Sequence, residues 1–137
     1  MNETAPREDE LVARAMEAKG QASAPYSGFA VGAALLAADG TIYTGCNVES
    51  SSYGLSICAE RVALAKAISE GRREFVALAI VTEVEDFCPP CGACRQLLWD
   101  YVPDLQLIVA TRSGRRRHYR LRDLFPEAFD NHFLRQR

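Results

Sequence analysis

The feature that most constrains this chain is a set of three cysteines and one glutamate at two separate places. Cys58 and Glu60 stand in the triplet Cys-Ala-Glu, and Cys91 and Cys94 stand in the pentapeptide Pro-Cys-Gly-Ala-Cys. Three thiolates can hold a metal ion and leave its fourth position open, and a carboxylate that is not a ligand can act beside it as a base. The fold must therefore bring these two segments together.

The spacing between the two cysteine segments permits this convergence. A helix predicted over about 58–69 travels about 18–20 Å at ~1.5 Å per residue. An apolar strand predicted over 75–82 then returns about 25 Å at ~3.3 Å per residue. With another helix predicted over 92–101, each cysteine segment opens a helix. Two helix N-termini then meet beyond the carboxyl ends of strands, where α/β folds place ligands.

The rest of the chain alternates helix and strand patterns. Apolar residues at helical spacing predict a helix over 8–20. The turn Ala38-Asp39-Gly40 between apolar runs predicts a hairpin of strands over 30–38 and 41–46. We also expect a long loop over 47–57, strands over 105–111 and 115–120, and short helices over 121–125 and 129–134. This order predicts one α/β domain, residues 1–137, with helices on both faces of a mixed sheet.

Composition and charge limit the class of protein. A length of 137 residues, a hydrophobic share of 48 % and a net charge of −2 are typical of one globular domain. No segment approaches the ~20 apolar residues that cross a membrane, and the polar, acidic residues 1–10 are not typical of a signal peptide. We therefore expect a cytoplasmic protein whose five cysteines are reduced.

Charge is unevenly distributed. Acidic residues open the chain, and arginines gather near its end, at Arg112, Arg115, Arg116, Arg117, Arg120 and Arg122. We interpret the arginine-rich segment as a solvated strand pair or a subunit contact. A polynucleotide-binding patch is the alternative, and the nearly neutral net charge argues against it.

A structural metal or an iron–sulfur cluster is the alternative interpretation of the cysteines. Cys88 extends the second segment to the spacing C-x₂-C-x₂-C, but position 98 is Leu where a ferredoxin segment has its fourth cysteine. A closed structural zinc site needs a fourth ligand, which Cys88 or Cys46 could supply. Cys46, at the end of a predicted strand, is better interpreted as a small buried residue.

Two arginines directly follow the cysteine segments. Three thiolates leave a bound Zn²⁺ with a net negative charge, which weakens it as a Lewis acid. Helix N-termini carry positive partial charge and stabilise thiolates. Either Arg61 or Arg95 could also hydrogen-bond a thiolate sulfur and so restore the acidity of a water on the metal.

The pattern C-x-E followed by P-C-x-x-C is the cysteine form of the signature of zinc deaminases that act on nucleobases. From about residue 26 to residue 129, the chain resembles the small, homotetrameric cytidine deaminases. Four blocks carry the resemblance in order: Tyr26–Ala34, Gly45–Glu49, Cys58–Arg61 and Pro90–Gln96. The resemblance implies a three-layer α/β/α sandwich around a mixed five-stranded sheet.

The resemblance also implies the chemistry of the site. Cys58, Cys91 and Cys94 resemble the ligands of one Zn²⁺ per subunit, and Glu60 resembles the proton shuttle. The backbone of Ala59 resembles the group that recognises the pyrimidine. The implied reaction is hydrolysis of the 4-amino group of cytidine and 2′-deoxycytidine, a step of pyrimidine salvage (EC 3.5.4.5).

Further residues resemble those that bind the nucleoside. Phe29 resembles the aromatic residue that packs on it, and Asn47 and Glu49 resemble the pair that binds the ribose. Tyr53 and Phe129 resemble residues that reach the site of a neighbouring subunit in a homotetramer. Each also has a plainer interpretation, because Phe29 and Phe129 could be packing residues, Asn47 a turn residue and Glu49 a surface charge.

Two other functions remain open from the sequence. A blasticidin-type deaminase would share the zinc site, although the N-x-E pair and Phe29 favour a nucleoside substrate. A polynucleotide-binding or editing deaminase would use the arginine-rich segment, and its binding would weaken steeply with salt.

Overall fold

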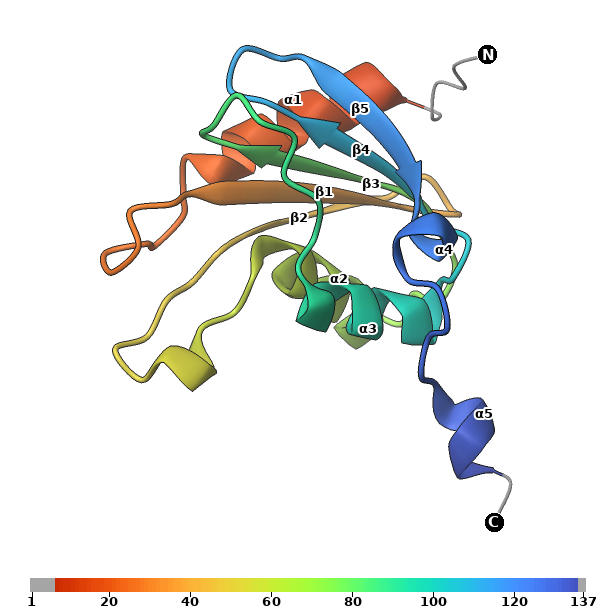
Figure 1. Ribbon diagram of the computed structural model, residues 1–137. Coiled ribbons are helices and arrows are strands. Elements are labelled where there is room, and N and C mark those ends of the chain that lie inside the picture. The colour runs from red at the N-terminus through yellow and green to blue at the C-terminus, as the bar shows by residue number, and fades with distance from the viewer. Residues whose placement is uncertain (1–6, 136–137) are drawn as a thin grey trace.

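A computed structural model of the chain describes residues 7–135 and contains a five-stranded mixed sheet between two layers of helices (Figure 1). The strand order is β2-β1-β3-β4-β5. Strands β3 and β4 are parallel, and the other neighbouring pairs are antiparallel. The predicted three-layer α/β/α sandwich is therefore confirmed. Most of the polar N-terminal segment, residues 1–6, lies outside the described residues.

The elements follow the order predicted from the sequence. They are α1 (Glu8–Lys19), β1 (Val31–Ala37), β2 (Ile42–Cys46), η1 (Tyr53–Leu55), α2 (Ala59–Ser69), β3 (Phe75–Thr82), α3 (Gly92–Tyr101), β4 (Gln106–Ala110), β5 (Arg116–Arg120), α4 (Leu121–Leu124) and α5 (Asn131–Leu134). The short 3₁₀ helix η1 is the one of these elements that was not predicted, because it falls inside the segment expected to be a loop.

Alternation along β1 divides the apolar side chains between two cores. Leu35 packs with residues of α2 and α3 on one face of the sheet, whereas Leu36 packs with residues of α1 on the other. Figure 1 shows α1 on one side of the sheet and α2 and α3 on the opposite side. Because both faces are covered, β1, β3 and β4 are almost continuously apolar, as buried strands of α/β proteins are.

Two glycines let the helices approach the sheet closely. A Cβ atom at Gly32 of β1 would lie 1.9 Å from the carbonyl oxygen of Ala15 in α1. A Cβ atom at Gly45 of β2 would lie 2.4 Å from the carbonyl oxygen of Ala59 in α2. Any larger residue at position 45 would push the start of α2 away from the sheet, so Gly45 helps to set the position of the first cysteine segment.

The arginine-rich segment includes the edge strand β5 and makes contacts within the chain. Arg116 pairs with Glu8 of α1 at 3.0 Å. The guanidinium groups of Arg115 and Arg117 lie 5.1 and 4.4 Å from the centre of the Phe87 ring. These cations therefore stabilise the chain's own fold. Within residues 7–135, no helix has both the length and the apolar character needed to span a bilayer.

Candidate active site

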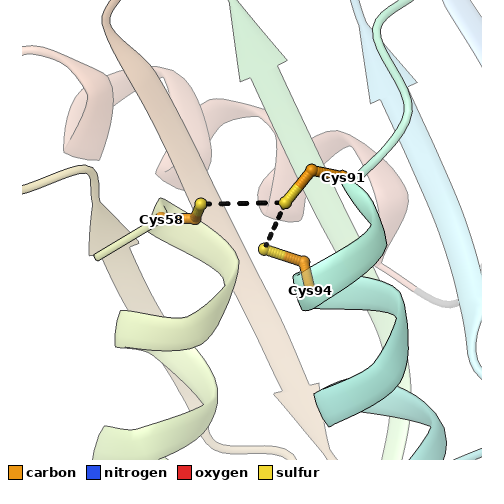
Figure 2. A group of neighbouring side chains, drawn as sticks. All are labelled: Cys58, Cys91 and Cys94. Atoms are coloured by element: carbon orange, nitrogen blue, oxygen red, sulfur yellow. Dashed lines mark hydrogen bonds between the residues drawn. The ribbon is translucent and has the colours of Figure 1, made fainter. Parts of the chain in front are cut away.

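The starts of α2 and α3 bring the three predicted metal ligands together. Cys58 is the N-cap residue of α2, Cys91 is the N-cap residue of α3, and Cys94 lies in the first turn of α3. Figure 2 shows the three side chains pointing toward one another from the two helix ends. The Sγ atoms of Cys58 and Cys91 are 3.9 Å apart, and those of Cys91 and Cys94 are 3.6 Å apart.

The donor atoms fit a zinc ion. Sulfurs placed tetrahedrally about 2.3 Å from zinc lie about 3.8 Å from one another, which is close to both measured separations. Thiolates are also the soft ligands that zinc favours. Among residues 7–135, the cysteines that cluster in this way are Cys58, Cys91 and Cys94. Cys88 does not join them, so the geometry favours three ligands and an open fourth position over a closed structural site.

Hydrogen bonds to Cys58 favour its ionised thiolate form. A hydrogen bond from the Cys94 thiol, assisted by Arg61 and Cys91, lowers the pKa of Cys58 to about 5. The same hydrogen bond, together with burial, raises the pKa of the Cys94 thiol. Ionisation of Cys58 is therefore favoured within the cluster, and a divalent cation would favour ionisation of the others.

The two arginines that follow the cysteine segments have different partners. Nη2 of Arg61 lies 3.8 Å from Sγ of Cys58 and also donates to the carbonyl oxygen of Ser56 at 3.1 Å. Arg95 instead donates to the carbonyl oxygens of Pro90 and Leu124 at 2.7 and 2.8 Å. The structure therefore places Arg61 against a ligand sulfur, whereas Arg95 supports the backbone that carries the second cysteine segment.

Glu60, predicted to be the proton shuttle, is a buried carboxyl group beside the cysteines. It lies in the first turn of α2, and only 6 % of its surface is exposed. Burial, and after it the negative charge of Cys58, raises the pKa of Glu60 to about 7. A carboxyl group with a pKa near the working pH can both accept and return a proton.

A cavity of about 260 Å³ joins this machinery to most of the predicted substrate-binding residues. Its wall includes Phe29, Asn47, Glu49, Cys58, Ala59, Glu60 and Cys91. Ala59 lies at the first position of α2, where backbone N–H groups have no acceptor within the helix. The residues that resemble a nucleoside site in sequence thus surround one cavity.

Asn47 and Glu49 shape this cavity through hydrogen bonds to the preceding loop. The Asn47 amide accepts from the N–H of Val31 at 2.9 Å and donates to the carbonyl oxygen of Phe29 at 2.8 Å. The Glu49 carboxylate accepts from the N–H of Ser27 at 3.1 Å and from its hydroxyl. Both residues hold the segment that carries Phe29, a positioning task that the sequence analysis did not identify.

Two predicted residues lie outside the cavity. Tyr53 is 77 % exposed on η1 and makes an edge contact with Tyr26, with ring centres 6.3 Å apart. Phe129 is 53 % exposed, and its ring stacks on Phe133 at 5.9 Å. Neither side chain lines the cavity of its own chain. Cys46, expected to be buried, is only half-buried at the end of β2.

The cavity also contains residues to which the sequence analysis assigned no role. Ser27 is one, and its place in the first sequence block was the available signal. Thr82 is another, at the last position of β3. The rule that α/β proteins bind ligands at the carboxyl ends of strands pointed to this region, but the sequence did not show which face of the strand Thr82 occupies.

Comparison with known proteins agrees with this geometry. A family model described as the cytidine and deoxycytidylate deaminase zinc-binding region matches residues 6–109. The match, the sheet and the three converging cysteines define the class of zinc-binding deaminases. A cytidine deaminase of Halalkalibacterium halodurans is 46 % identical over 120 residues, which cover 87 % of this chain and 91 % of the relative. The chain belongs to the cytidine deaminase family.

Solved structures and a more distant relative extend the comparison. A cytidine deaminase from Burkholderia pseudomallei has a TM-score of 0.86 at 45 % identity, covering 88 % of this chain and 98 % of that one. A blasticidin-S deaminase of Bacillus cereus is 32 % identical over 87 residues, which cover 58 % of this chain and 62 % of the relative. The similarity to cytidine deaminases therefore spans more of the chain.

Proposed function

We propose that this chain is a zinc-dependent cytidine deaminase that converts cytidine to uridine, and 2′-deoxycytidine to 2′-deoxyuridine, with release of ammonia. The observation that carries the proposal is one cavity whose wall includes the buried Glu60 and two of the three clustered cysteines, Cys58 and Cys91. The relatives that this chain resembles are cytidine deaminases, which supports cytidine as the substrate.

Glu60 performs the proton transfers. When bound by the three cysteines, zinc supplies a Lewis acid that makes water a nucleophile near neutral pH. The Glu60 carboxylate accepts a proton from the attacking water and delivers it to N3 of the base as C4 is attacked. Glu60 then takes the remaining proton from the new hydroxyl group on C4 and passes it to the amino group, so that the C4–N bond breaks, C4=O forms and ammonia leaves. A pKa of about 7 suits both directions of transfer.

The other residues of the cavity position the substrate. We expect Phe29 to pack on the base and the N–H of Ala59 to donate to it. Asn47 and Glu49 bind the ribose hydroxyls through the donor and acceptor positions that their hydrogen bonds to the loop do not use. In the described part of the chain, neither a lysine nor an arginine lines this cavity. This charge pattern favours an uncharged nucleoside over a nucleotide with a 5′-phosphate.

We also propose a homotetramer in which neighbouring subunits complete each site. The exposed aromatic rings of Tyr53 and Phe129 are available for such contacts. Figure 1 shows α5, which follows Phe129, projecting away from the layer of α2 and α3. An isolated subunit that exposes Phe129, Phe133 and Leu134 on this segment would present apolar side chains to water.

The remaining sequence expectations stay predictions. They are one catalytic domain over residues 1–137, a cytoplasmic location and a role in pyrimidine salvage.

The test is to mix the purified, zinc-loaded protein with cytidine and follow the change in ultraviolet absorbance as uridine forms. We expect rapid conversion that a chelator abolishes and added zinc restores. Parallel assays with 2′-deoxycytidine and with blasticidin S measure specificity. A zinc-loaded protein that leaves cytidine unchanged and deaminates blasticidin S would contradict the proposal and identify the alternative substrate.

A further inference from the structure

The hydroxyl group of Thr82 stands out among the polar groups of the cavity wall. Thr82 is 1 % exposed, and it lines the cavity that contains Glu60. Its Oγ1 atom is buried and has no hydrogen-bond partner within the described residues. Buried hydroxyl groups are nearly always hydrogen-bonded, and those without a partner in the protein call for an explanation.

The strand register places Thr82 on the face of the active site. Leu78 and Ile80 of β3 pack in the core between the sheet and helices α2 and α3. Since side chains alternate along a strand, Thr82 lies on that same face. Thr82 also pairs across the sheet with Val31, whose N–H is bound by Asn47. The hydroxyl is therefore built into the rigid floor of the cavity.

The depth of Thr82 indicates which part of a nucleoside it meets. Ser27 and Glu49 belong both to this cavity and to an adjoining surface pocket, so they mark its open end. Thr82 is almost inaccessible and lies beside the apolar wall formed by Val31 and Ile80. A planar base fits the deep apolar end, and a hydroxylated sugar fits the polar open end.

We propose that Thr82 is a further substrate-binding residue, whose hydroxyl hydrogen-bonds the pyrimidine base of the bound nucleoside. This inference rests on the proposed function. Among residues 7–135 the buried hydroxyl has no partner, and the polar edge of the base supplies one. Its loss would therefore weaken binding of the substrate without weakening the fold.

Thr111 provides a matched control. It directly follows β4, the parallel neighbour of β3, and it is 0 % exposed. Its hydroxyl has partners in the chain, because Oγ1 accepts from the N–H of Arg115 at 3.1 Å and lies 3.4 Å from Oγ of Ser113. Two threonines at the ends of adjacent strands thus differ in whether the protein itself satisfies the hydroxyl.

The experiment compares Thr82→Val, Thr82→Ser and Thr111→Val as zinc-loaded full-length proteins. We measure kcat and KM for cytidine, Ki for uridine and the Tm of each free enzyme. Thr82→Val should lower kcat/KM and weaken uridine binding about five- to tenfold, with a Tm no lower than that of the wild type. Thr82→Ser should recover most of this loss. Thr111→Val should lower the Tm and leave kcat/KM unchanged.

Two results would overturn the inference while the wild-type protein converts cytidine. One is a Thr82→Val protein with wild-type kcat/KM and Ki. The other is a Tm that falls as far in Thr82→Val as in Thr111→Val, which would make the hydroxyl structural. A zinc-loaded wild type without turnover of cytidine would instead overturn the proposed function, and this inference with it.

Discussion

Two glutamates in this chain are equally buried, yet their surroundings differ. Glu8 at the start of α1 and Glu60 at the start of α2 are each 6 % exposed. Glu8 binds Arg116 at 3.0 Å and His118 at 2.7 Å, both on β5. Within residues 7–135, Glu60 forms no ion pair with a lysine, arginine or histidine, and it lines a cavity beside the cysteine thiols; Arg61 acts on its pKa through charge alone.

We interpret the difference as that between a structural carboxylate and, under the proposed function, a reactive one. A buried charge that is matched by cations and hydrogen bonds fixes the packing of the elements that carry it. A buried carboxyl group beside other negative groups keeps a raised pKa, and such groups are characteristic of catalytic sites. Burial alone therefore does not indicate function, whereas burial without a matching cation, in a cavity, does.

Replacement of Glu60 should have the largest effect on activity. Glu60→Gln keeps the shape of the side chain but cannot accept a proton. Since one carboxylate serves two proton transfers, we expect kcat for cytidine to fall about 10⁴-fold. Zinc content, measured by metal analysis, and the Tm should not fall, because glutamine keeps the shape of the side chain and removes the cost of burying a charge that no ion pair offsets within residues 7–135. A variant that retained a tenth of wild-type kcat would show that another group transfers the proton.

Replacement of Glu8 should have the opposite outcome. Glu8→Gln removes the charge that matches Arg116 and the carboxylate that lies against the His118 ring, and both partners are partly exposed. We expect the free energy of unfolding to fall by about 2–3 kcal/mol, as for hydrogen bonds to charged groups. It is measured by denaturant titration of the zinc-loaded protein. The values of kcat and KM should match those of the wild type. Lost activity in a stable Glu8→Gln protein would break the comparison, because it would couple α1 to the active site.

The sequence predicted these two regions unequally. Cys58, Glu60 and Cys91 lie within short segments at helix starts, so their function can be predicted once two helices are placed. The partners of Glu8 are 108 and 110 positions away, and only the packing of α1 beside β5 brings them together. The sequence therefore showed Glu8 as part of an acidic end, with no indication that it is buried.

The same distinction between local signals and contacts of distant residues explains which other features the sequence predicted and which it did not. Most elements were predicted because each has local start and stop signals, such as the Asp39-Gly40 turn between β1 and β2. The cavity wall was predicted in part, because membership of a wall depends on register and on neighbouring elements. Two features could not be predicted for this reason, because both depend on how the elements pack: the hydroxyl of Thr82, which has no partner among the described residues, and the contact between Ser27 and Glu49.

A third carboxylate sharpens the comparison. Glu49 is half-buried, and hydrogen bonds from Ser27 and the N–H of Tyr26 lower its pKa. We expect Glu49→Gln to raise KM for cytidine about tenfold, through a weakened charged hydrogen bond to ribose, and to change kcat little. Steady-state kinetics with cytidine measure both values. A change in kcat without a change in KM would show that Glu49 does not bind the ground-state nucleoside.

The lowered pKa of Glu49 also determines how its contribution to stability and to KM varies with pH. Its ordinary value is 4.5. The loop contacts to the carboxylate therefore stabilise the folded protein above pH 4.5. This stabilisation is lost only as the pH falls through the lower pKa of the folded state. Between about pH 5 and 8, KM for wild type and for Glu49→Gln should change in parallel. A ratio of the two KM values that varies in this range would mean that Glu49 titrates there.

Asp9 should show the smallest effect, and it tests whether burial decides the role of Glu8. Asp9 binds the same Arg116 guanidinium at 2.6 Å, but its side chain is 94 % exposed. Since water and salt screen an exposed ion pair, we expect Asp9→Asn to lower the free energy of unfolding by less than about 0.5 kcal/mol. The same denaturant titration, repeated at high salt, should reduce this difference further. If Asp9→Asn were as destabilising as Glu8→Gln, proximity to Arg116 rather than burial would account for the stability that Glu8 provides. The difference between Glu8 and Glu60 would then depend only on whether the carboxylate has an ion-pair partner within residues 7–135, and not on burial.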